Sequence, residues 1–164
     1  MDFFNYRNST NEQALFAEDV ALSQIAERFG TPSYVYSSAA LIARYQAFSE
    51  AVGNSLVCYS VKANDNLAVL RCLAGQGAGV DIVSGGELAR AMAADIAPEK
   101  IVFAGVGKTG DEMADALDAD IGQFNVESEE ELEMLASLAA ERGVQASVAL
   151  RVNPDVDAKT HEKI

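Results

Sequence analysis

The sequence predicts an α/β fold in which about the first five strands of a (β/α)₈ TIM barrel are present. From residue 55 onward, short apolar runs alternate with amphipathic stretches, and each strand–helix unit takes about 20–25 residues. The apolar runs are nearly continuous, which is typical of strands buried on both faces of a parallel sheet. No Gly-x-Gly-x-x-Gly motif follows the first run, which disfavours a Rossmann domain.

The expected strands and helices of this sheet alternate along the chain. The strands are expected at residues 56–61, 80–83, 101–104, 121–126 and 148–152, and the helices between them at 67–76, 87–94, 110–117 and 129–142. A closed barrel needs eight strands, and fewer leave open edges that full closure would remove. We therefore expect the chain to be a fragment of a longer protein.

The residues before this sheet have a different pattern. Strand-like aromatic runs at 3–6 and 34–36 flank a helix in which Leu22, Ile25, Ala26 and Phe29 fall at helical spacing. Gly30, followed by Thr-Pro, ends that helix, and a second helix is expected at 38–52.

Composition and charge exclude several classes of protein. A hydrophobic content of 49% with 3 prolines indicates a globular chain. A formal net charge of −13, with 12 basic residues scattered among 25 acidic ones, argues against a nucleic-acid partner. The sequence contains no run of about 18 apolar residues and no secretory signal at its start, so a cytoplasmic protein is expected. Cys58 and Cys72 lack CxxC spacing, which predicts free buried thiols rather than a disulfide or metal site.

Polar residues follow all five expected strands, where barrel enzymes carry their catalytic groups. They are Lys62 and Asn64, Asp81 and Ser84, Lys108, Asn125 and Glu127, and Arg151 and Asn153. Each also has a structural interpretation, since the glycines here can turn the chain and Ser84 or Ser128 can cap the helix that follows.

Lys62 is the most informative of these residues. It ends an apolar run, which predicts a stem packed among apolar neighbours and a pKa lowered by desolvation, as Schiff-base chemistry requires. The residues alone leave open whether Lys62 is catalytic or forms a salt bridge with Asp81 at the barrel mouth.

Five motifs carry a family resemblance. Residues 59–64, Tyr-Ser-Val-Lys-Ala-Asn, resemble the cofactor-lysine motif of the alanine-racemase-like, fold-type III pyridoxal-phosphate enzymes. Four more segments resemble diaminopimelate decarboxylases, within the class II ornithine, lysine and arginine decarboxylases: 80–88, 101–109, 124–128 and 150–157. The resemblance extends over almost the whole chain.

The resemblance implies pyridoxal 5'-phosphate as cofactor and assigns roles to four residues. Lys62 would hold the cofactor as a Schiff base, and Asp81 would act with it as an orienting charge. Arg151 would lie beneath the pyridine ring, and Ser84 near the cofactor. The only histidine, His161, is interpreted as a loop or packing residue.

Lys108 stands on a glycine-rich loop and could touch a carboxylate. A solvated loop lysine is the favoured interpretation.

The activity implied is decarboxylation of meso-2,6-diaminopimelate to L-lysine and CO₂, the last step of lysine biosynthesis, by a homodimer. A decarboxylase acting on ornithine, arginine or carboxynorspermidine is an alternative, as is a non-catalytic homologue that binds a partner. Without the resemblance, a small-molecule binding protein would fit equally well.

The resemblance also implies a division of the chain. Residues 1–37 would contribute to a C-terminal β domain, and residues 38–164 would form an incomplete cofactor-binding barrel. The phosphate-binding loop and the substrate-clamping residues of the family would lie beyond residue 164. We therefore expect the free 164-residue polypeptide to be inactive, and lysine production by it would contradict this expectation.

Overall fold

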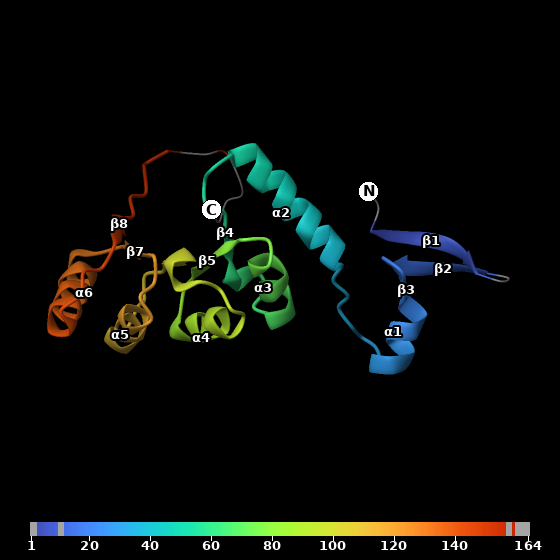
Figure 1. Cartoon of the computed structure of the whole chain (residues 1–164), viewed down its shortest axis with the longest axis horizontal. Coiled ribbons are helices and arrows are strands. Elements are labelled where there is room, and N and C mark those ends of the chain that lie inside the picture. Colours follow the sequence, from blue (N-terminus) through green and yellow to red (C-terminus); the bar gives the residue numbers. More distant parts are fainter. Residues whose placement is uncertain (1–2, 10–11, 157–158, 160–164) are drawn as a thin grey trace.

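The computed structural model describes residues 3–9, 12–156 and 159. Figure 1 shows a small N-terminal unit and a larger α/β unit, with a long helix running between them. The N-terminal unit contains β1 (Phe4–Ser9), β2 (Glu12–Ala17), β3 (Val20–Ala21) and α1 (Leu22–Phe29), and the long helix is α2 (Ser38–Val52).

The larger unit is a five-stranded parallel sheet with strand order β4-β5-β6-β7-β8. The strands are β4 (Cys58–Ser60), β5 (Gly79–Ile82), β6 (Ile101–Phe103), β7 (Gln123–Val126) and β8 (Val148–Leu150). The helices that connect them are α3 (Leu67–Ala74), α4 (Gly85–Ala93), α5 (Gly110–Asp118) and α6 (Glu129–Arg142). All nine elements were predicted in order, and the structure confirms the partial barrel, with every strand except β5 shorter than predicted.

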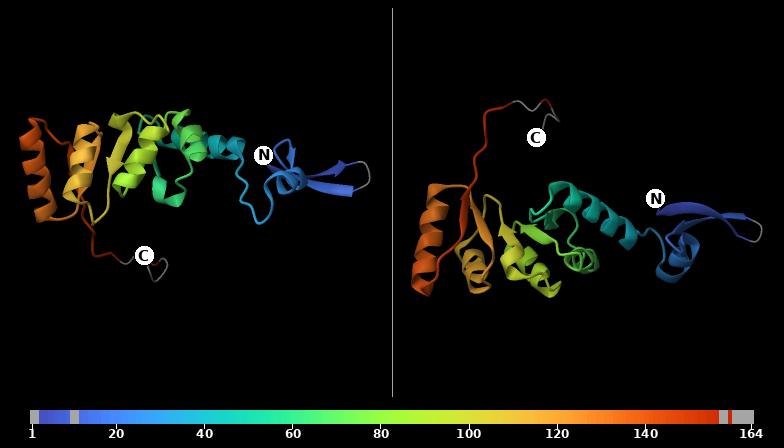
Figure 2. Two further views of the ribbon diagram at one scale, coloured as in Figure 1. Left: turned by 90° about the horizontal axis from the view of Figure 1, so that it is seen from below. Right: turned by 45° about the horizontal axis from the view of Figure 1, so that its top comes forward.

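The connecting helices lie along one face of the sheet (Figures 1 and 2). Val80 and Ile82 of β5 are fully buried on this side, whereas Asp81 between them is only half-buried. The prediction of strands buried on both faces was therefore wrong. The inner face of a barrel is covered only when the ring of strands closes, and the five described strands leave that face open.

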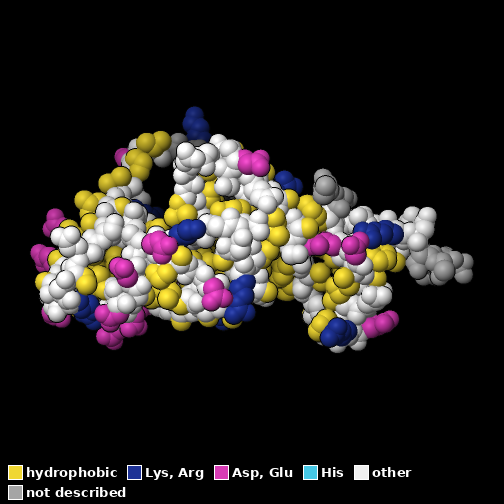
Figure 3. Space-filling view, in the orientation of Figure 1, with side chains coloured by type: hydrophobic (Ala, Val, Ile, Leu, Met, Phe, Trp, Pro, Cys, Tyr) yellow, Lys and Arg dark blue, Asp and Glu magenta, His cyan; other side chains and the backbone are white. Residues whose placement is uncertain are grey.

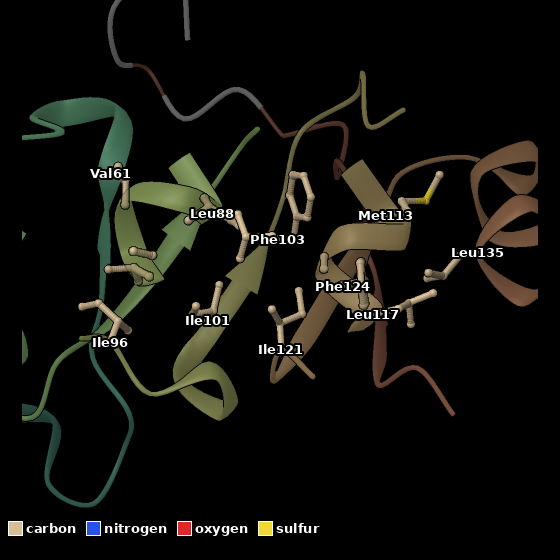
Figure 4. Packing of buried hydrophobic residues seen from close by; sticks show 14 of the residues in the cluster. Val61, Leu88, Ile96, Ile101, Phe103, Met113, Leu117, Ile121, Phe124 and Leu135 are labelled. Atoms are coloured by element: carbon tan, nitrogen blue, oxygen red, sulfur yellow. The ribbon is translucent and has the colours of Figure 1, made fainter. Parts of the chain in front are cut away.

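The core fills the space between the sheet and its helices (Figure 4). Phe103 of β6 stacks on Phe124 of β7 with ring centroids 6.2 Å apart. Burying each ring stabilises the fold by about 1.5–3 kcal/mol relative to an exposed ring. The helices contribute side chains such as Leu88, Met113 and Leu135 to the same cluster.

The N-terminal unit is an antiparallel sheet of order β1-β2-β3. Strand β2 was not predicted, because its sequence Glu-Gln-Ala-Leu-Phe-Ala has helix-forming composition and only pairing with β1 makes it extended. The predicted strand at 34–36 is wrong: this stretch has no strand partner among the described residues, and Tyr34 is 92% exposed.

Glu18, in the turn between β2 and β3, joins this unit to helix α2. Its Oε1 accepts hydrogen bonds from the Ser37 hydroxyl at 2.8 Å and from the Ala39 backbone N–H at 3.0 Å. These hydrogen bonds lower the pKa of the Glu18 carboxyl, and the one from the Ala39 N–H has the largest effect. The contact places a negative charge at the positive end of the helix, which is favourable for α2.

The surface is acidic where helices α5 and α6 face solvent (Figure 3). The exposed carboxylates there are Asp111, Asp115, Asp118, Glu129, Glu130, Glu133 and Glu141. None of the helices in the described part of the chain has the length and apolar character needed to cross a membrane. Cys58 and Cys72 are free thiols, as predicted, although both are half-buried rather than buried.

Candidate active site

The parallel register brings the predicted site residues to one edge of the sheet. Lys62 follows β4, Asp81 is the third residue of β5, Ser84 follows β5, and Arg151 follows β8. Because the carboxyl ends of parallel strands meet at the same edge, residues nearly 90 positions apart in sequence share one surface.

Lys62 sits in the short 3-10 helix Val61–Ala63 that continues β4. Val61 is fully buried, and the Asn64 backbone N–H donates to the Val61 carbonyl at 3.0 Å, so the turn that carries Lys62 is fixed. Lys62 itself is exposed. The prediction of a stem packed among apolar neighbours is therefore wrong, because the turn directs the residue after Val61 out of the sheet.

Asp81 lies on the face of the sheet opposite the helices. Its Oδ2 accepts a hydrogen bond from the Ser60 hydroxyl at 3.3 Å, and the two residues are register partners on β5 and β4. The ion pairs among the described residues do not include one between Asp81 and Lys62, so the salt-bridge alternative is not what the structure shows. The Lys62 amine is left accessible.

Ser84 caps helix α4. Its hydroxyl accepts from the Glu87 backbone N–H at 3.2 Å, and the Glu87 carboxylate accepts from the Val83 N–H at 2.8 Å. Ser128 caps α6 in the same way, with the Glu131 N–H at 3.1 Å. The capping interpretation is thus correct for both serines, and each hydroxyl keeps its proton available to a ligand.

Arg151 leaves the sheet after β8 and turns back toward β7. Its guanidinium donates to both oxygens of Glu127, at 3.2 and 3.4 Å, and to Asn153 Oδ1 at 3.4 Å. The Arg151 side chain is 51% exposed, whereas the Glu127 side chain is 8% exposed. A half-open guanidinium at this edge is suited to an anionic or aromatic ligand.

Lys108 is not the solvated loop lysine that was predicted. Its side chain is fully buried, and its ammonium donates to Glu131 Oε1 at 2.7 Å and to the carbonyls of Gly105 and Asn125, each at 2.8 Å. An ammonium has three N–H donors, and all three are used. Lys108 therefore holds the loop between β6 and α5, and it has no donor left for a substrate.

The sequence reasoning missed three glutamates that form hydrogen bonds at the starts of α4, α5 and α6, although the sequence carries a signal for them. A Ser or Thr is followed three residues later by Glu at the start of α4, α5 and α6, which is the capping-box pattern. At α5 the box is complete: Glu112 accepts from the Thr109 N–H and Thr109 Oγ1 accepts from the Glu112 N–H. Glu112 also accepts from the Gly85 N–H at 2.8 Å, which ties α5 to the first residue of α4.

The comparisons with known proteins agree with this geometry. Residues 38–164 match the family model described as the pyridoxal binding domain of pyridoxal-dependent decarboxylases. The chain belongs to this family. His161, which the sequence places after Arg151, lies within the matched range but outside the described residues.

Two curated relatives and one solved structure illustrate how similar this pyridoxal-binding domain is to known proteins. The chain is 59% identical to diaminopimelate decarboxylase of Pseudomonas aeruginosa and 54% identical to that of Vibrio cholerae, in each case over its whole length and over 39% of the relative. A structure of diaminopimelate decarboxylase from M. jannaschii in complex with L-lysine matches 99% of the chain and 38% of its own length, with 38% identity and a TM-score of 0.85. The chain thus spans about two fifths of the relatives it matches.

The residues at the sheet edge fit the cofactor named by the family. Pyridoxal carries an aldehyde, which needs a primary amine that is accessible and free of an ion pair. Lys62 is exposed, and no ion pair with it is found among the residues that the structure describes. Lys108, the other lysine that follows a strand of the sheet, is excluded because all its donors are bound within the protein.

Proposed function

We propose that the protein to which this chain belongs is a pyridoxal-phosphate-dependent decarboxylase that converts meso-2,6-diaminopimelate to L-lysine and CO₂. The observation that carries the proposal is the accessible Lys62 amine at the carboxyl edge of the sheet. It occurs in a chain 59% identical to a diaminopimelate decarboxylase.

Four residues of the chain would bind or orient the cofactor. Lys62 would hold the cofactor covalently through its amine, from a backbone turn anchored by the buried Val61. Asp81 presents a carboxylate on the open face of the sheet, where it would orient the lysine amine, with Ser60 donating to that carboxylate. Ser84 and Arg151 offer a hydroxyl proton and a guanidinium to the bound group.

The bound cofactor would supply the electronic part of the reaction. When bound, it would offer a conjugated ring able to take up the electron pair released as carbon dioxide leaves the substrate. The protein would position the bond to be broken and keep the charged groups at the site fixed.

Partners and location are part of the same proposal. The substrate would be a small amino acid, in keeping with the L-lysine present in the M. jannaschii complex. We further propose a homodimer in the cytoplasm. Residues 1–37, whose antiparallel strands lie apart from the parallel sheet (Figure 2), would join a β domain formed with the rest of the protein.

Borohydride reduction of the complete protein tests the assignment of Lys62. Reduction converts a covalent cofactor–lysine link into a stable pyridoxyl-lysine, which peptide mass spectrometry locates. The adduct is expected on Lys62, and it should be lost in Lys62→Arg, which keeps the positive charge but does not form the link. An adduct on any other lysine of the wild-type protein would overturn the assignment.

A substrate panel then decides the reaction. Release of CO₂ should be fastest from meso-2,6-diaminopimelate, with ornithine, arginine and carboxynorspermidine as comparison substrates. If the protein decarboxylates one of these three compounds faster than meso-2,6-diaminopimelate, that compound replaces diaminopimelate as the proposed substrate. An intact adduct with no turnover of any of the four would favour the non-catalytic alternative.

A further inference from the structure

We propose that Glu127 is a positioning residue that holds the guanidinium of Arg151 at the carboxyl edge of the sheet. The proposal rests on the proposed function, since it takes Arg151 to face the cofactor. It begins from one contact: Arg151 Nη1 lies 3.2 Å from Glu127 Oε2 and 3.4 Å from Glu127 Oε1.

Glu127 is itself held from a second direction. Its Oε1 accepts the backbone N–H of Gly105 at 2.7 Å, and its side chain is only 8% exposed. One carboxylate therefore joins the loop after β6, the end of β7 and the first residue after β8. A carboxylate fixed by a backbone N–H cannot swing with its side-chain rotamers, so its orientation is passed on to the arginine.

The Gly105 backbone is also fixed, by the buried Lys108. The Lys108 ammonium donates to the Gly105 carbonyl and to the Asn125 carbonyl, each at 2.8 Å. Gly105 has φ +105°, a backbone conformation that residues with a side chain rarely adopt. The loop at Gly105 also passes close to Val83, which lies between β5 and α4. The buried ammonium thus sets the position of the N–H that orients Glu127.

Arg151 needs such a partner because it is otherwise poorly restrained. It is half-exposed, and among the described residues its remaining side-chain hydrogen bond is to Asn153 at 3.4 Å, near the distance limit for such a bond. A long arginine side chain loses considerable rotamer freedom when it is fixed, and a charged partner offsets that loss. The carboxylate also reduces the net positive charge that Arg151 presents to a ligand, which a neutral residue would not do.

Glu127→Gln separates this role from a purely structural one. Glutamine keeps the size of Glu127 and can still accept the Gly105 N–H, but its amide would turn N–H donors toward the guanidinium. The matched control is Glu130→Gln, since Glu130 is an exposed carboxylate on the same chain segment. Arg151→Met and the double variant complete a mutant cycle in the full-length protein.

The dissociation constant of pyridoxal phosphate and the pH dependence of the bound cofactor's absorbance are the measurements. Glu127→Gln should weaken cofactor binding by about 10-fold, the lower end of what loss of an orienting partner costs at a bound centre. It should also shift the absorbance titration in the same direction as Arg151→Met. The double variant should bind no more weakly than Arg151→Met alone, because Glu127 acts through Arg151.

The proposal would be overturned if the losses of cofactor affinity in the two single variants added up in the double variant. It would also be overturned if Glu127→Gln or Arg151→Met kept the cofactor affinity and the absorbance titration of the wild type. A lower thermal midpoint in Glu127→Gln with an unchanged absorbance titration would show a structural role and would also overturn it. These measurements need no substrate. Failure to decarboxylate diaminopimelate is therefore a separate outcome, which counts against the proposed function and leaves the cycle interpretable.

Discussion

The ammonium of Lys108 lies 2.7 Å from the carboxylate of Glu131, and the two side chains are 0% and 9% exposed. Charges removed from water in this way are stable only while paired and hydrogen-bonded, because removal of one partner leaves a buried charge uncompensated. The pair joins the loop after β6 to the first turn of α6. It therefore couples two adjacent strand–helix units from inside the protein.

Lys108→Met should destabilise the full-length protein by about 3–5 kcal/mol, the cost of breaking a buried ion pair. Adding Glu131→Leu should recover part of the lost stability, because no buried charge then remains unpaired. The recovery should be incomplete, because the Gly105 and Asn125 carbonyls still lack the donor that Lys108 supplied. Equilibrium denaturation of the single and double variants measures both effects. A Lys108→Met protein as stable as the wild type would contradict the buried pair.

Lys62→Ala should leave stability within about 0.5 kcal/mol of the wild type, as expected for an exposed side chain. Lys100→Ala is the comparison, because the Lys100 ammonium is part-buried and donates to the Gly77 carbonyl at 3.2 Å. Thermal unfolding without added cofactor should show a loss for Lys100→Ala alone. A large loss in Lys62→Ala would mean that the Lys62 side chain is packed after all.

Stability should depend on pH through Glu112. Hydrogen bonds from the Gly85 and Thr109 backbone N–H groups, in that order, lower the pKa of the Glu112 carboxyl from its ordinary value of 4.5. A group whose pKa is lowered by folding stabilises the protein above its unfolded pKa, and the contribution is lost as the pH falls through the folded value. Glu112→Gln should therefore cost about 0.5–1 kcal/mol at pH 7, the size of one capping interaction.

The difference between wild type and Glu112→Gln should shrink as the pH falls below about 4.5. Unfolding of both proteins measured at a series of pH values checks the sign. A difference that grows in acid would contradict the assignment.

Gly122→Ala should destabilise the fold by about 1–3 kcal/mol, as overpacking does. A Cβ at Gly122 would overlap the Glu99 carbonyl, which is backbone and cannot turn aside. Gly107→Ala is the matched control, because a Cβ there meets nothing within 4 Å. Denaturation of both variants should show a loss for Gly122→Ala only, and equal stabilities would count against the close approach.

The order of strands and helices could be read from the sequence because each element carries its own signal. Apolar runs such as residues 101–104 and capped helices such as 129–142 are local patterns, and the structure reproduces them. Strand β2 was not predicted, for the opposite reason. Its local composition favours a helix, and only its pairing partner β1, which lies next to it in space, makes it a strand.

The candidate site divides in the same way. Sequence alone determined which residues stand at strand ends, among them Lys62, Asp81 and Arg151, because strand ends follow from periodicity. It could not determine which of two lysines is free. The tertiary structure decided that: a turn anchored by Val61 exposes Lys62, while carbonyls and a carboxylate from neighbouring strand–helix units enclose Lys108. Burial and ion pairing depend on neighbours that only folding brings together.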